Sequence, residues 1–235
     1  MHATIGRDRR QVTNISIVKR LIYKDWYFNR TVITLLTIGG LIALAMFGVS
    51  CGPIRIIAAV LFIGAASVLI FTPIWTVLGE RRDQTLAFVI SLPVSIKGYT
   101  VAKVVGTMLS GMSLWLILII AYVTAALFYK PIAAGSIPAM MVIFGALLVV
   151  FCLNLGTALV TEGDKPTLFV TIVSNLCFWF FWSFFYNMSF ITPDLRSPTI
   201  VWHPEIVRIL VVEVIAAGVL LAVTFYLQSR KTDFI

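Results

Sequence analysis

A charged segment, LGERRDQTLAFVISLPVSIKGYTVAKVV (residues 78–105), separates two long apolar runs of this chain. It begins with two acidic and two basic residues, continues through an apolar stretch and meets Pro93, which ends the helix that the pattern predicts. Two neighbouring membrane helices need a connection of only a few residues. The extra length therefore predicts a short helix that lies across one face of the membrane, with a charged end that contacts another protein.

The chain around this segment has the composition of a membrane protein. It is 60% hydrophobic and 12% charged, whereas soluble domains are roughly 45–50% apolar and 25% charged. Runs with at most one charged residue, each about as long as the ~20 residues of a spanning helix, are 31–54, 56–79, 104–129, 131–161, 166–193 and 209–229. They do not alternate as barrel strands do. We predict an all-α membrane protein with six transmembrane helices, at about 31–50, 56–78, 104–128, 138–160, 166–188 and 206–228.

The basic residues predict the orientation of these helices. With a cytoplasmic N-terminus, the inner segments hold fourteen of the 18 Lys and Arg residues, so both termini are expected in the cytoplasm. The residues before the first run lack the pattern of a secretory signal peptide, and we expect them to be retained in a protein of the cell (cytoplasmic or inner) membrane. The net charge of +8 is explained by this topology and by attraction to anionic lipids, so no nucleic acid is expected as a partner.

The N-terminal region precedes the first span. Residues 1–12 are polar and basic and predict a flexible tail, whereas residues 13–30 predict an amphipathic interfacial helix. Lys24 lies on its polar side and Trp26 on its apolar side. Asp25 also lies on the apolar side, where an unpaired carboxylate costs free energy. Either a basic group from another segment meets Asp25 or the helix bends.

Three features inside or between the spans stand out. Pro73 predicts a kink near the inner end of the second span. Nine aromatic residues in 175–190 fit either an outer aromatic belt or an aromatic-lined substrate site. The stretch 191–208 contains three prolines and predicts short re-entrant helices at the outer interface before the last span.

We expect no catalytic, cofactor-binding or metal site in this chain. It contains no phosphate-binding loop, nucleophile elbow or zinc-protease helix motif. His203 and Glu205 stand close in sequence, but two ligands do not close a zinc site. Glu213 is the one ionisable residue well inside a span. Either it faces a cavity or the bundle interior as a functional group, or it makes a structural hydrogen bond between helices.

The charged segment and the N-terminal helix resemble the membrane-spanning permease subunits of type-2 ABC transporters, which are mostly exporters. Members of that family typically have a Lys-Asp pair before the first span. After the second span they have an acidic residue, a Thr-Leu step, an SLPVS segment and an Ala-Lys or Gly-Lys pair. In this chain these features are, in order, Lys24-Asp25, Glu80, Thr85-Leu86, Ser91-Leu92-Pro93-Val94-Ser95 and Ala102-Lys103. The other spans are not specific to this family.

The resemblance implies a half-transporter that works with a second permease copy or paralogue and exports an amphipathic or apolar cargo such as a drug, lipid or peptide. It also implies a cytoplasmic coupling helix between spans 2 and 3 that engages a separate ABC ATPase subunit. That subunit would bind ATP and Mg, so this chain is not expected to be an enzyme itself. The residues expected to couple to the ATPase are Glu80, Arg81, Arg82, Asp83, Thr85, Leu86 and Pro93.

Two rival interpretations stay open at this stage. One is a membrane scaffold or sensor subunit whose charged segment binds a regulatory protein. The other is a secondary carrier, which is disfavoured because inverted repeats and paired intramembrane charges are not evident in the sequence.

Overall fold

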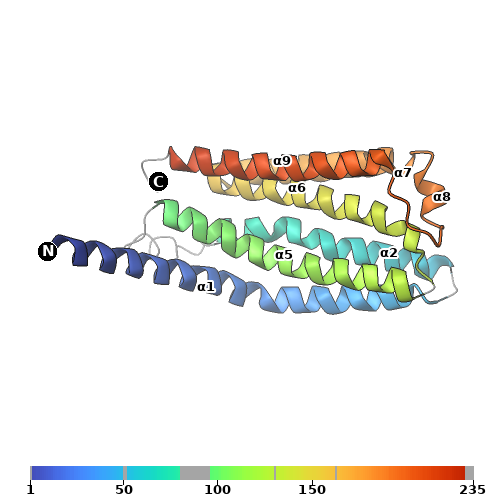
Figure 1. The fold of residues 1–235 in the computed structure, drawn as a ribbon, viewed down its shortest axis with the longest axis horizontal. Coiled ribbons are helices and arrows are strands. Elements are labelled where there is room, and N and C mark those ends of the chain that lie inside the picture. Colours follow the sequence, from blue (N-terminus) through green and yellow to red (C-terminus); the bar gives the residue numbers. More distant parts are fainter. Residues whose placement is uncertain (1, 50–51, 80–95, 130, 162, 231–235) are drawn as a thin grey trace.

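The computed structural model describes residues 2–49, 52–79, 96–129, 131–161 and 163–230, which form a bundle of helices (Figure 1). No strand occurs in these ranges. The long helices are α1 (His2–Met46), α2 (Gly52–Ser67), α5 (Ile96–Phe128), α6 (Ile137–Thr161), α7 (Asp164–Tyr186) and α9 (Pro204–Ser229). The short helical elements are η1 (Val68–Phe71), η2 (Ile74–Leu78), η3 (Ala134–Ser136) and α8 (Ile191–Asp194).

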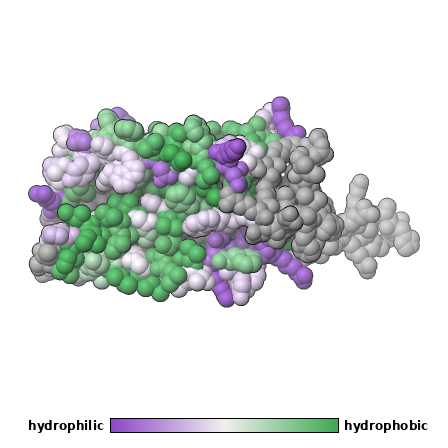
Figure 2. Space-filling model, turned by 180° about the vertical axis from the view of Figure 1, so that it is seen from behind, coloured by the Kyte–Doolittle hydropathy of each residue, from purple (hydrophilic) through white to green (hydrophobic). Residues whose placement is uncertain are grey.

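Five helical segments are long and apolar enough to cross a membrane: Ser16–Met46, Gly98–Phe128, Ala134–Thr161, Asp164–Tyr186 and Pro204–Ser229. The shortest of them has 23 residues, and at 1.5 Å per residue a helix of that length is roughly 35 Å long, which exceeds the ~30 Å hydrocarbon layer. On the face shown in Figure 2, hydrophobic residues cover much of the middle, and hydrophilic residues gather at one end and beside the grey region. The chain is therefore a multi-pass helical membrane protein, which confirms the predicted class.

The second predicted span, 56–78, is not a regular α-helix over its whole length. Only the 16 residues of α2 are regular, and the 3-10 turn η1 and the π-helical turn η2 follow on either side of Pro73. Proline has no N–H and its ring excludes the carbonyl four residues earlier, so regular α-helical hydrogen bonding cannot pass through it. This irregular region is where the sequence predicts a kink.

Helix α1 differs from the expected tail and separate interfacial helix. It runs without interruption from His2 to Met46, so the segments 1–12 and 13–30 from the sequence analysis join the first apolar run in one helix (Figure 1). No proline or glycine lies between Arg7 and Ile38, and nothing in that stretch stops a helix from propagating. The change from polar to apolar residues marks a change of surroundings, not an end of the helix.

The bundle is organised around α6. This helix packs against α7 and α9, while α1 packs against α5 and α2. About two thirds of the apolar window of α6 is buried inside the protein, more than in any other candidate span of the described residues. Its sequence is apolar on all sides, as expected for a helix with neighbours all round. The largest fully buried side chains of the core include Phe62, Leu114, Leu118, Leu147 and Phe151.

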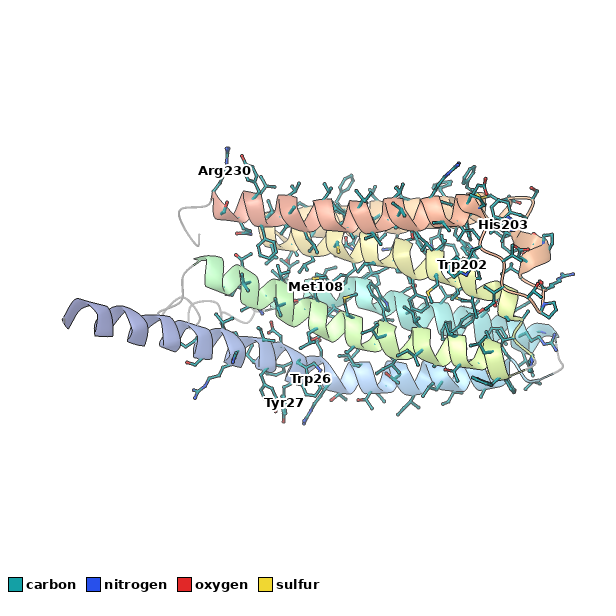
Figure 3. All side chains as sticks on the ribbon, in the orientation of Figure 1. Trp26, Tyr27, Met108, Trp202, His203 and Arg230 are labelled. Carbon is teal, nitrogen blue, oxygen red and sulfur yellow. The ribbon has the colours of Figure 1, made fainter. Side chains whose placement is uncertain are left out.

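The two ends of the bundle differ. At the end that we call the connector end, η2 stops at Leu78 and α5 starts at Ile96, on either side of residues 80–95. The opposite end, the loop end, carries α8 and the extended residues before α9, where Trp202 and His203 lie (Figure 3). The stretch 191–208 thus contains one four-residue helix and an N-terminal turn of α9, where the sequence predicts short re-entrant helices. His203 Nε2 lies 2.8 Å from an Asp194 carboxylate oxygen and ties this loop together.

Candidate functional site

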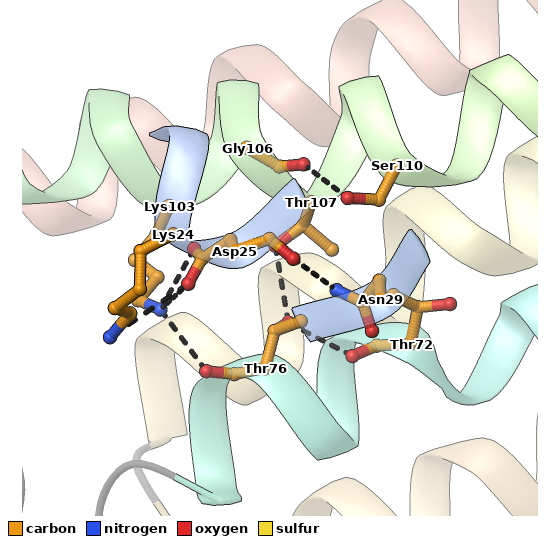
Figure 4. A network of polar contacts seen from close by, with 9 residues as sticks. All are labelled: Lys24, Asp25, Asn29, Thr72, Thr76, Lys103, Gly106, Thr107 and Ser110. Atoms are coloured by element: carbon orange, nitrogen blue, oxygen red, sulfur yellow. Dashed lines mark hydrogen bonds and ion pairs between the residues drawn. The ribbon is translucent and has the colours of Figure 1, made fainter. Parts of the chain in front are cut away.

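A cluster of polar side chains is buried between α1, η2 and α5 near the connector end (Figure 4). At its centre, Lys103 Nζ donates to both carboxylate oxygens of Asp25, at 3.0 and 2.9 Å. The same ammonium group donates to the backbone carbonyl of Thr76 at 3.2 Å. Asp25 is 5% exposed and Lys103 is 1% exposed, so this ion pair is withdrawn from solvent. One lysine thus joins three helices that are far apart in sequence.

Further hydrogen bonds surround this ion pair. Asn29 Nδ2 donates to the backbone carbonyl of Asp25 at 2.9 Å. Thr76 and Thr107 share a hydroxyl–hydroxyl hydrogen bond of 3.2 Å between η2 and α5. Together with Thr72, Gly106 and Ser110, these residues form what we call the Asp25–Lys103 cluster. Because buried polar groups are costly when unpaired, the bonds specify how the three helices fit together.

Glycine at position 106 lets α1 and α5 come close enough for the ion pair. A Cβ atom at Gly106 would lie 3.2 Å from an Asp25 carboxylate oxygen and 3.5 Å from the Cα of Ile22. Larger side chains there would separate the two helices. Small residues commonly allow the backbones of two membrane helices to approach each other closely.

The carbonyl that Lys103 binds lies in the irregular part of the second segment. Thr76 is in the middle of the π-helical turn η2, three residues after Pro73. π-Helical turns inside α-helices are rare and frequently occur at functional sites. Here the turn ends at Leu78, just before residues 80–95, and α5 begins just after them. The Asp25–Lys103 cluster therefore holds together the two helices that flank this segment.

The structure places the three expected residues of the interfacial helix next to one another on α1, with different surroundings. Asp25 is in the cluster, while Lys24 is partly exposed, with Nζ 4.0 Å from the Asp25 carboxylate. Trp26 is exposed and, with the neighbouring Tyr27, lies on the outside of α1 (Figure 3). Of the two explanations for Asp25, the basic partner from another segment is confirmed. The expected coupling residues Glu80, Arg81, Arg82, Asp83, Thr85, Leu86 and Pro93 lie outside the described residues.

Sequence reasoning did not single out Lys103 as the partner of Asp25, nor Thr76 or Thr107 as cluster residues. A usable signal was the helical spacing of small and polar residues at the start of α5. Ala102, Lys103, Gly106, Thr107, Ser110 and Gly111 recur at intervals of three and four, and all are buried. A lysine within such a stripe faces the protein interior and needs a carboxylate.

Glu213 lies at a second location, in α9, facing α6. It is 8% exposed, and neither carboxylate oxygen has a hydrogen-bond partner among the described residues. A Cβ atom at Gly145 of α6 would overlap its carboxylate, so the two helices touch at this point. Glu213 also borders a groove of about 490 Å³ between α6, α7 and α9. The structural alternative, a hydrogen bond from Glu213 to another helix, is absent from the described part of the chain.

No protein-family model, curated protein or solved structure matches this chain. A functional assignment therefore depends on the residues and their geometry.

Proposed function

We propose that this chain is the membrane-spanning permease subunit of an ATP-driven transporter of the ABC type, most similar in plan to an exporter. In this proposal residues 52–79 form the second of six spans despite their irregular turns. Both termini and residues 80–95 lie on the cytoplasmic side of the cell membrane. The chain works with a second copy or a paralogue. ATP and Mg bind to ATPase domains outside these 235 residues, which contain no phosphate-binding loop.

The observation that carries the proposal is the position of the Asp25–Lys103 cluster. It joins η2, which ends just before residues 80–95, to α5, which begins just after them, and it joins both to α1. If an ATPase moves residues 80–95, the bonded helices have to move with them. Packed elements move as nearly rigid bodies in such transitions. If residues 80–95 only linked two spans, the bonds from η2 and α5 to α1 would not be needed for that purpose.

The charges of the connecting segment offer a direct test. Exchanging them in the double variant Glu80→Lys with Arg81→Glu is expected to abolish efflux of fluorescent amphipathic compounds from cells, because the ATPase would no longer engage. The amount of folded protein in the membrane is expected to stay normal, since both residues lie in the charged segment outside the predicted spans. The matched control is Glu205→Lys with Arg208→Glu, an exposed acid–base pair at the loop end. Normal efflux by the first variant would rule out the coupling role.

A secondary carrier would transport without any ATPase. Purified chain alone in liposomes, with an ion gradient and no ATP, separates the two functions. The proposal predicts no transport there, whereas uptake driven by the gradient alone would establish a carrier. A scaffold or sensor subunit would transport in neither assay.

A further inference from the structure

The groove next to Glu213 is bounded by three helices. Helices α7 and α9 both pack on α6, and they meet each other near the loop end through an apolar cluster that includes Phe185 and Ile206. Below this cluster the two helices leave a groove of about 490 Å³. That volume lies within the roughly 300–1,000 Å³ of small-molecule sites. The structure therefore contains a groove of the right size for a drug-sized molecule.

The wall of this groove is almost entirely apolar, with one exception. Valine, leucine, alanine and phenylalanine side chains line it, along with Ser174 and Cys177. The hydroxyl of Ser174 donates to the carbonyl of Thr171 in its own helix, at 3.1 Å. Of the described residues that line the groove, Glu213 is the only charged one. It neighbours Gly145 of α6, whereas the lining of α6 continues to Leu153, roughly 12 Å further along a helix at 1.5 Å per residue.

The carboxylate of Glu213 has no partner in the described residues. Arg208, the nearest cation in sequence, is exposed on α9, and no ion pair joins it to Glu213 in the described ranges. A buried ionised carboxylate is costly unless a cation accompanies it. A metal ion would need several oxygen ligands, and the residues around Glu213 do not supply them. A protonated amine needs only one carboxylate, and an apolar body attached to it would fill the rest of the groove.

We propose that the groove between α7 and α9 is a binding site for a lipophilic amine. Both oxygens of the Glu213 carboxylate are buried beside Gly145, and the protonated nitrogen of the amine pairs with them once this side chain turns toward the groove, while the apolar body lies along α6 toward Leu153. As a binding site the groove is independent of ATP. Its role as the cargo site rests on the proposed transport function. The complementary features are one buried carboxylate at the part of the groove nearest Gly145 and an apolar wall along the remaining length.

The test compares two fluorescent probes of nearly equal shape, 1-pyrenebutylamine and 1-pyrenebutanol. Binding is measured by equilibrium dialysis against the chain in nanodiscs of zwitterionic phosphatidylcholine, and partition into empty nanodiscs is subtracted. The amine is expected to bind saturably and roughly tenfold more tightly than the alcohol, since a hydrogen bond to a charged group contributes at least one such factor. No ATP or ATPase is present, so a failed transport assay does not affect this result.

Three variants assign the binding to the groove. Glu213→Gln keeps the shape and removes the charge, so it is expected to remove the preference for the amine while the alcohol binds as before. Unchanged binding of the alcohol also shows that the groove of this variant is intact. Glu205→Gln, an exposed position on the same helix outside the groove lining, is expected to behave like the unsubstituted chain. Val149→Phe fills the groove and is expected to weaken both probes.

Three results would overturn the proposal. Equal binding of amine and alcohol to the unsubstituted chain would mean an apolar groove without charge selection, such as a site for lipid acyl chains. A preference for the amine that persists in Glu213→Gln would place the amine elsewhere. Absence of saturable binding by either probe would mean that the groove is not a small-molecule site, as when a helix of a second copy fills it.

Discussion

At the scale of single residues, one ion pair accounts for a carboxylate that otherwise lies on the wrong side of its helix. The sequence alone shows that Asp25 faces the apolar side of α1 and requires either a partner or a bend. The sequence alone does not identify the partner, because Lys97 and Lys103 both lie near the start of α5. In the folded protein Lys103 is a partner, because its ammonium group donates to both carboxylate oxygens of Asp25.

The energy of this ion pair is best measured by a double-mutant cycle. Asp25→Asn and Lys103→Met are each expected to lower the free energy of unfolding by about 3–5 kcal/mol, because each leaves the other group buried without its charged partner. In the double variant, the free energy of unfolding is expected to fall by clearly less than the sum of the two single losses. Unfolding in mixed detergent micelles measures all three. Lys24→Met is the control and is expected to cost about 1 kcal/mol or less, because Lys24 is partly exposed. Additive losses would show that the two groups do not interact.

Glu213 contrasts with Asp25, because its buried carboxylate has no partner among the described residues. Its depth in the last span could be predicted from the sequence, because it interrupts a run that is otherwise apolar. The groove beside it could not, because a groove depends on how α7 and α9 diverge across α6. No local pattern encodes that distance.

At the scale of helices, apolar runs locate the middle of each helix better than its ends. The predicted spans 138–160, 166–188 and 206–228 agree to within about two residues with α6, α7 and α9. Helices α1 and α5 begin far earlier than their apolar runs do. Charged residues end an apolar run, but lysine and arginine are good helix formers and do not end a helix. The interruption around Pro73 was predictable because proline acts locally.

The contact between α1 and α5 makes a prediction about Gly106. Gly106→Leu is expected to push α1 away from α5 and to lower the free energy of unfolding by about 1–3 kcal/mol, the usual cost of overpacking. The control is Gly64→Leu on α2, where a Cβ atom would have nothing within 4 Å. Thermal unfolding of both variants in detergent, followed by size-exclusion chromatography, compares them. Equal stability of the two would mean that α1 does not pack closely at position 106.

At the scale of the whole molecule, the class could be predicted from composition and the topology from the distribution of basic residues. Five apolar helices confirm the class, while the orientation in the membrane stays a prediction. The orientation depends on which side of the bilayer the lysine and arginine residues face, and the packing of the helices does not distinguish the cytoplasmic side from the outer side.

Labelling single cysteines tests this orientation. In a variant with Cys51, Cys152 and Cys177 replaced by serine, Thr199→Cys at the loop end is expected to react with a membrane-impermeant maleimide in intact cells. Ser229→Cys, at the end of α9, is expected to react only after the cells are permeabilised. Both positions are exposed, so their chemical accessibility is matched. The reverse pattern would invert the topology and put residues 80–95 outside the cell.

If residues 80–95 engage an ATPase, that protein should accompany the chain through purification. The chain is purified in a mild detergent from its own membranes at near-native expression, and the accompanying proteins are identified by mass spectrometry. We expect a protein with a phosphate-binding loop, G-x-x-x-x-G-K-[ST], in amounts comparable to the chain. We expect that protein to be lost from the variant Glu80→Lys with Arg81→Glu. Recovery of the chain without any such protein, or equal recovery of that protein with the charge-exchanged variant, would contradict the engagement of an ATPase by residues 80–95.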